Sequence, residues 1–151
     1  MPEKETLDRA RRDKRQGKTP STQAGEFVRE EIHHIREGKH GARSTKQAIA
    51  IGLSKARRAG VNLKPPKSGS ASSKTRQRAE RDYKKGQSSS IERPAPKRSR
   101  ATLRALQRES GSAASSRALS HQAHSSARRR TSASRSAASR KAARTRAKLK
   151  H

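Results

Sequence analysis

The sequence predicts a mostly α-helical chain in which one short helix–loop–helix hairpin is combined with extensive disorder. Hydrophobic residues make up 26% of the 151 residues, and Phe27 and Tyr83 are the only aromatic residues, so material for a core is scarce. The formal net charge is +28, with 40 Lys and Arg against 12 Asp and Glu, and this self-repulsion opposes compaction. Apolar residues recur at clear helical spacing mainly between about residues 21 and 63.

Residues 1–17 are predicted to form a basic N-terminal helix. Pro2 suits the first turn, acids lie early and bases late, and Gly17 can end the helix. Within residues 2–16 only Leu7 and Ala10 are apolar. The helix is therefore expected to be solvated, or to form only on binding.

Residues 18–66 are predicted to contain the hairpin. Its first helix, from residue 21 to about residue 37, has one apolar stripe with steps of three or four residues, formed by Ala24, Phe27, Val28, Ile32 and Ile35. Gly38 can end this helix. Residues 38–43 then form a short loop bounded by glycine.

The second helix of the hairpin is predicted to begin at a capping box. The Ser44 hydroxyl would accept a hydrogen bond from the Gln47 amide, and the Gln47 side chain would reach back. The helix is predicted to end at Gly60, with Val61 contacting Ala56 as in a Schellman motif. A hairpin alone buries too little apolar surface to offset the cost of ordering it, so self-association or ordering on DNA is expected.

The remaining residues read as a linker and a tail. Residues 67–98 are predicted to be a linker, within which residues 74–85 could form a short charged helix. Residues 99–151 are predicted to be a Ser/Ala/Arg/Lys-rich tail that is disordered or becomes helical on binding. From residue 110 onward, 33 of 42 residues are Ser, Ala, Lys or Arg, and none is acidic.

Catalytic and metal sites are not predicted. The chain has no cysteine, no apolar run long enough to cross a membrane and no glycine-rich phosphate loop. His33, His34 and His40 do not have the spacing of a zinc signature, so no metal or other cofactor is expected. The acidic residues of the hairpin are expected to form ion pairs that hold its orientation, and these are Glu26, Glu30, Glu31 and Glu37.

The charge excess favours a polyanion as partner, because phosphate neutralisation releases counterions. Two aromatic residues cannot build a base-stacking platform for single strands, so double-stranded DNA is favoured over RNA. The candidate phosphate-binding residues of the hairpin are Lys39, Arg43, Lys46, Lys55, Arg57 and Arg58. Those of the tail are Arg128, Arg129, Arg130, Arg135, Arg140, Lys141, Arg144, Arg146 and Lys148.

Two stretches, residues 21–41 and 42–57, resemble a family of small basic bacterial proteins of uncharacterised function, often labelled DNA-binding or plasmid-stabilisation-like. The most specific part is the run Lys-Gln-Ala-Ile-Ala-Ile-Gly-Leu-Ser at residues 46–54, and the resemblance extends over about residues 9–66. It implies a bacterial nucleic-acid setting and transfers no catalytic residue. The tail is similar in composition to the arms of linker-histone-like proteins.

The sequence therefore predicts a non-enzymatic, nucleoid-associated or histone-like protein of the bacterial cytoplasm. It would bind double-stranded DNA largely without regard to sequence and could self-associate through the hairpin. No membrane and no small-molecule substrate are expected. Two alternatives stay open, namely an RNA- or ribosome-associated basic protein and a protein-docking module in plasmid maintenance.

Overall fold

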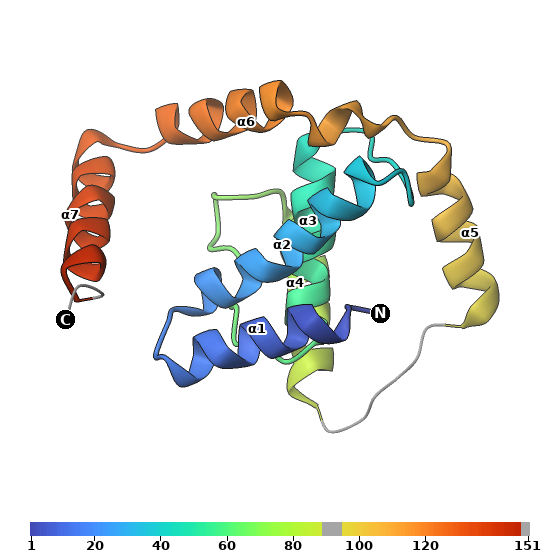
Figure 1. The fold of residues 1–151 in the computed structure, drawn as a ribbon, viewed down its shortest axis with the longest axis horizontal. Coiled ribbons are helices and arrows are strands. Elements are labelled where there is room, and N and C mark those ends of the chain that lie inside the picture. Colours follow the sequence, from blue (N-terminus) through green and yellow to red (C-terminus); the bar gives the residue numbers. More distant parts are fainter. Residues whose placement is uncertain (89–94, 149–151) are drawn as a thin grey trace. The chain divides into compact units, whose positions relative to one another are not determined.

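A computed structural model describes residues 1–88 and 95–148 (Figure 1). These residues form helices and connecting loops and contain no strand. The elements in chain order are α1 (Lys4–Arg15), α2 (Pro20–Arg36), α3 (Thr45–Arg58), α4 (Ser73–Gln87), α5 (Pro96–Gln107), the 3-10 turn η1 (Gly111–Ala114), α6 (Ser116–Arg128) and α7 (Ser132–Lys148). The chain divides into two compact units, residues 1–115, called the core unit below, and residues 116–151, called the cationic unit.

The expectation of extensive disorder is wrong, because helices extend through most of the described residues outside the hairpin as well. The expectation gave charge repulsion too much weight against the high intrinsic helix propensity of Ala, Arg and Lys. Local caps add to this effect. The Ser72 hydroxyl accepts from the Thr75 amide at the start of α4, and the Thr131 hydroxyl accepts from the Ser134 amide at the start of α7.

Helix α1 is not the solvated helix that the sequence predicts, since it packs along α2 (Figure 1). Its buried face consists of Thr6, Ala10 and Asp13, which follow one another by four and three residues. Ala10 and the partly buried Leu7 join a cluster with Phe27 of α2. Small residues let the two helices approach closely, so a stripe without large apolar side chains still forms a contact.

The hairpin of α2 and α3 has the predicted ends. The Ser44 hydroxyl accepts from the Gln47 amide at 3.2 Å, and the Gln47 side chain accepts from the backbone amide of Arg43 at 2.8 Å. At the far end of α3, the Val61 amide donates to the Ala56 carbonyl at 3.1 Å, as in a Schellman motif. These capping predictions are confirmed.

Two glycines allow helices to meet backbone to backbone. A Cβ atom on Gly52 of α3 would lie 2.6 Å from the Cα of Val28 in α2. A Cβ atom on Gly86 of α4 would lie 1.7 Å from the carbonyl oxygen of Arg57 in α3. Any side chain at either position would push two helices apart.

Segments assigned to linker and tail complete the core unit. Asp82 of α4 accepts hydrogen bonds from Ser54 and Arg58 of α3, both at 2.7 Å. The Thr45 hydroxyl donates to the Ala113 carbonyl at 2.7 Å. The core unit thus supplies the contacts that a lone hairpin lacks, which removes the reason for expecting self-association.

Residues 106–115 are part of this packing rather than of a free tail. The amide of Gly41 donates to the Leu106 carbonyl at 2.9 Å, and the amide of Ala42 donates to the Ser110 carbonyl at 3.1 Å. Arg36 donates to the Ala114 carbonyl at 2.9 Å. Helix α5 begins at Pro96, a position where proline suits the first turn, so residues 96–98 are helical and not part of an extended linker.

Candidate functional site

The cationic unit concentrates positive charge. Eleven of the 40 Lys and Arg residues and none of the 12 acids lie in residues 116–151. Every residue of α7 is exposed, and α6 has no buried residue. Nine cations that the sequence singled out lie here, with Arg128 at the end of α6, Arg129 and Arg130 in the connection, and Arg135, Arg140, Lys141, Arg144, Arg146 and Lys148 on α7.

The charges of α7 surround the helix. Arg140, Arg144 and Lys148 follow one another by four residues and form one row, whereas Arg135 and Arg146 are three turns apart on another side. Like charges four residues apart destabilise an isolated helix by about 0.2–0.5 kcal/mol per pair. A polyanion would remove this repulsion, and the absence of an apolar stripe leaves α7 without a face for a hydrophobic partner.

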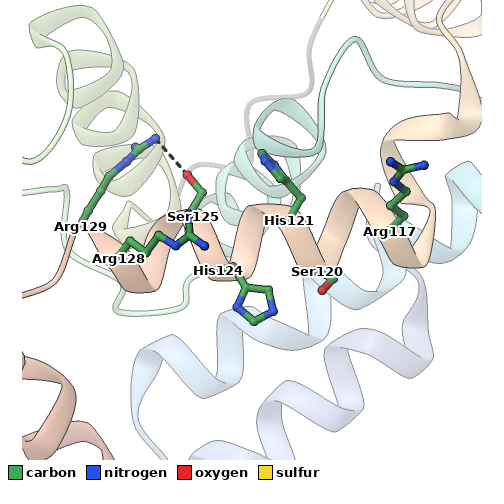
Figure 2. A pocket seen from close by; sticks show the side chains of 7 residues that line it. All are labelled: Arg117, Ser120, His121, His124, Ser125, Arg128 and Arg129. Atoms are coloured by element: carbon green, nitrogen blue, oxygen red, sulfur yellow. Dashed lines mark hydrogen bonds between the residues drawn. The ribbon is translucent and has the colours of Figure 1, made fainter.

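Helix α6 has a basic hollow on its surface, lined by Arg117, Ser120, His121, His124, Ser125, Arg128 and Arg129. All of these residues come from α6 and the residue that follows it, and Arg129 donates to the Ser125 hydroxyl at 3.4 Å (Figure 2). A hollow on a single helix cannot exclude water as an enzyme site does. Its chemistry is that of a cationic surface with hydroxyl donors, which suits phosphate oxygens.

Around the hairpin the structure separates the predicted phosphate ligands into three groups. Arg43 and Lys46 are exposed and, within the described residues, take part in no ion pair. Lys39 pairs with Glu37 at 3.0 Å, and Arg58 pairs with Asp82 at 2.7 Å while half of its side chain stays exposed. These four remain accessible to phosphate.

Lys55 and Arg57 do not fit the predicted role. Arg57 is 7% exposed, and its Nε donates to the Leu63 carbonyl at 3.1 Å. Burial lowers the pKa of Arg57, and the nearby Asp82 carboxylate opposes this effect. Lys55 lies against two buried carboxylates, as described below. The sequence pattern could not separate these residues from Lys46 and Arg58, because all four lie on α3.

The buried charge cluster consists of Glu30, Glu31, His40 and Lys55. The side chains of Glu30 and Glu31 are both 1% exposed. Lys55 Nζ lies 2.6 Å from Glu31 Oε2 and 3.5 Å from Glu30 Oε1, and His40 Nε2 lies 3.1 Å from Glu31 Oε1. Of the four acids expected to hold the hairpin by ion pairs, Glu30 and Glu31 do so through Lys55 of α3. The other two pair elsewhere, Glu26 with Arg9 of α1 and Glu37 with Lys39.

A second group of charges borders this cluster at the start of α1. Glu3 Oε1 lies 2.8 Å from His34 Nε2 and 3.3 Å from Lys39 Nζ. Hydrogen bonds from His34 and Lys39 lower the pKa of the Glu3 carboxyl. The hydrogen bonds of Glu37 and Glu3 raise the pKa of Lys39.

The sequence interpretation missed that Glu31, His34 and His40 meet. One possible ligand atom from each residue lies within 4.8 Å of those of the other two. Glu31 and His34 share a helix face at a spacing of three, which is a signal that the sequence contains. The approach of His40 depends on the turn at Gly38, and no spacing rule includes such a turn.

Among the residues that the structure describes, no helix is long and apolar enough to cross a membrane.

Comparison with known proteins adds a family match over part of the chain. Residues 11–68 match the model of a family of unknown function (DUF6496). No curated protein and no solved structure matches the chain. The matched stretch is less than half of the chain, extends from α1 to beyond α3, and contains Glu31, His34 and His40. The chain is therefore similar to a family without an assigned activity. The matched residues all lie in the core unit.

Proposed function

We propose that this protein binds nucleic acid without catalysis, and double-stranded DNA in preference to RNA, through phosphate contacts of the cationic unit. The observation that carries the proposal is the sequence of residues 116–151, which is rich in cations and has no acid, together with the exposure of its cations within residues 116–148. Neutralising such charges on phosphate releases counterions and gives affinity that does not depend on base sequence. Compaction of a bacterial nucleoid is a setting in which this mode of binding would serve.

The aromatic residues support a duplex as the ligand. Phe27 is 1% exposed, and the Tyr83 hydroxyl donates to Asn62 at 2.7 Å. Single-strand modules stack successive bases on several exposed aromatic rings, and with Phe27 buried only the partly exposed Tyr83 remains. Backbone contacts to a duplex require only charge and reach.

The core unit has a supporting role in this proposal. Arg43 and Lys46 lie at the start of α3, and their exposed side chains can add phosphate contacts. All 12 acids of the chain lie in the core unit, where they weaken the local positive potential. The cationic unit therefore supplies most of the affinity. The role of the core unit is to hold residues 1–115 in one folded unit.

The test is fluorescence anisotropy of the full chain on a labelled DNA duplex across a salt series. The variant changes the nine cations between Arg128 and Lys148 to Gln. The slope of log affinity against log salt should become shallower by up to about 8, at about 0.9 for each phosphate that is no longer neutralised. An unchanged slope contradicts the assignment to the cationic unit.

A competition experiment separates the ligand classes. Unlabelled duplex DNA and a structured RNA are compared as competitors at equal phosphate concentration. Stronger competition by DNA supports the proposal, whereas stronger competition by RNA favours the ribosome- or RNA-associated alternative. Absence of binding to either at low salt contradicts nucleic-acid binding and leaves protein docking as the function to pursue.

A further inference from the structure

We propose that Glu31, His34 and His40 form a binding site for a divalent first-row transition metal ion such as Zn²⁺. Two imidazoles and one carboxylate are the ligand types that such ions take in proteins. Their candidate ligand atoms lie within 4.8 Å of one another, so a small movement brings all three to one ion. This site is separate from the cationic unit and does not depend on the proposed DNA binding.

The His40 ring is held in the orientation that metal ligation requires. Its Nδ1 lies 3.0 Å from the Gly41 carbonyl oxygen, which can only accept. Nδ1 is therefore the donor, and Nε2 faces Glu31 Oε1 at 3.1 Å. Metal-binding histidines usually donate their second ring N–H to a carbonyl or carboxylate in this way.

The Glu31 carboxylate lacks sufficient partners. Its side chain is 1% exposed, and Lys55 Nζ and His40 Nε2 lie 2.6 Å and 3.1 Å from its two oxygens. Neither oxygen, however, accepts a hydrogen bond of good geometry from any residue that the structure describes. Glu30, also buried, leaves Oε1 without such a bond. Lys55 supplies one positive charge to these two carboxylates. A buried carboxylate is costly without full compensation, so the cluster favours a second cation beside Glu31 Oε1.

Lys55 and the metal ion would use different oxygens of Glu31. Lys55 Nζ contacts Oε2 at 2.6 Å, which leaves Oε1 on the side of His40. Lys55 thereby orients the carboxylate from outside the ligand shell. Loss of such outer partners typically lowers metal affinity 10–100-fold.

A metal ion can reach this site from the surface, and its binding would affect the neighbouring loop. A polar hollow lined by residues that include Glu3, Glu30, His34 and Lys39 opens beside the site. His34 is 13% exposed, and Glu3 next to it adds negative charge. An ion held by Glu31, His34 and His40 would fasten the loop after Gly38 to α2.

The experiment uses the full chain, freed of metal by EDTA and dialysis. Zn²⁺ alone is titrated by isothermal calorimetry, and Co²⁺ serves as a second probe through its visible absorption. We expect one site per chain, a rise in thermal unfolding temperature with Zn²⁺, and the strong visible bands of Co²⁺ in a site of low coordination number. Absence of a stoichiometric site overturns the proposal.

Variants identify the ligands. His40→Ala and Glu31→Gln should weaken Zn²⁺ binding by more than the roughly 10–100-fold that loss of an outer partner causes, and both should abolish the thermal shift. Glu31→Gln preserves the shape of the side chain, so it remains informative if His40→Ala does not fold. Circular dichroism checks the fold of each variant.

Matched controls exclude surface binding. His33 is exposed and adjacent to His34 in sequence, so His33→Ala should leave Zn²⁺ affinity unchanged. The double variant His121→Ala/His124→Ala removes the imidazoles of α6 and should also have no effect. Loss of binding in either control, with retention in His40→Ala, would show adventitious binding by surface histidines and would overturn the proposal.

Discussion

The core unit and the cationic unit have a similar bias towards Lys and Arg and use it in different ways. In the core unit, four acids form ion pairs where helices meet. Glu26 of α2 pairs with Arg9 of α1 at 2.6 Å, Glu30 and Glu31 of α2 pair with Lys55 of α3, and Asp82 of α4 pairs with Arg58 of α3. The cationic unit has no acid.

The difference shows that the placement of a few carboxylates decides which cations become structural. Arg9 and Lys55, which face Glu26, Glu30 and Glu31 at helix contacts, are largely withdrawn from solvent and support the fold. Arg58 pairs with Asp82 but keeps half of its side chain exposed. Where no carboxylate is present, the same residue types remain exposed on helices that bury nothing. Net charge alone describes neither unit.

The largest effect on the core unit is expected from Lys55→Met. This change leaves two buried carboxylates without their shared cation, and loss of one partner of a buried ion pair destabilises a protein by about 3–5 kcal/mol. Urea unfolding of the metal-free chain measures the change. The matched control is Lys39→Met, which removes exposed ion pairs with Glu3 and Glu37 and should lower the free energy of unfolding far less, because solvent screens exposed pairs. Equal losses would contradict the distinction between buried and exposed pairs.

The second largest loss of stability is expected from Gly52→Ala. The added methyl group meets the backbone of Val28, and overpacking of this kind costs about 1–3 kcal/mol or more. Gly25→Ala is the control, because a Cβ atom added to Gly25 of α2 would meet no atom within 4 Å, and alanine should stabilise that helix by up to about 1 kcal/mol. Thermal unfolding followed by circular dichroism shows whether each variant is less stable or more stable than the unchanged protein. Stabilisation by both changes would contradict the close contact of α2 and α3.

Thr45→Val tests whether residues 106–115 belong to the core unit. The change keeps the shape of the side chain and removes the buried hydrogen bond to the Ala113 carbonyl, at a cost of about 1–3 kcal/mol. Amide exchange near η1 should become faster. Thr145→Val removes the same type of bond in α7, where the Thr145 hydroxyl is exposed, and global stability should stay the same. Unchanged exchange near η1 would place this segment outside the cooperative unit.

The smallest effect is expected from Ala143→Gly in α7. Glycine lowers helix propensity by about 1 kcal/mol, so local helicity of the cationic unit should fall. Because α7 buries nothing, unfolding of the core unit should change by less than about 0.5 kcal/mol. Residue-resolved amide exchange measures both effects in one sample. A shift in core-unit stability would mean that the two units unfold together.

Local signals in the sequence predicted the hairpin well. The cap at Ser44, the turn at Gly60 and the apolar stripe of α2 depend on residues within about five positions of one another, and the structure contains all three. The long-range contacts were not predictable in the same way. The burial of Thr6 and Asp13 against α2 requires knowledge of which helices meet, and small polar residues leave no apolar signature.

The same contrast between local signals and long-range contacts applies to the candidate sites. Positive charge on residues 116–151 follows from composition, and the described part of this unit leaves it exposed. The approach of His40 to Glu31 depends on a turn and a loop, and the withdrawal of Arg57 depends on the carbonyl of Leu63. Such contacts are set by tertiary packing, which spacing along the chain does not encode.

The central claim is that the position of the cations, and not their number, determines nucleic-acid binding. Two full-length variants with equal net charge test it most directly by duplex-DNA anisotropy across a salt series. One changes the six cations of α7 to Gln. The other changes six exposed cations of the core unit that lie among acids or in its loops, namely Arg12, Lys14, Arg15, Lys64, Lys74 and Arg78. In the α7 variant, the slope of log affinity against log salt should become shallower by about 5, at about 0.9 per phosphate neutralised. In the core variant, it should change by less than half of that amount. Equal changes of slope in the two variants would contradict the account.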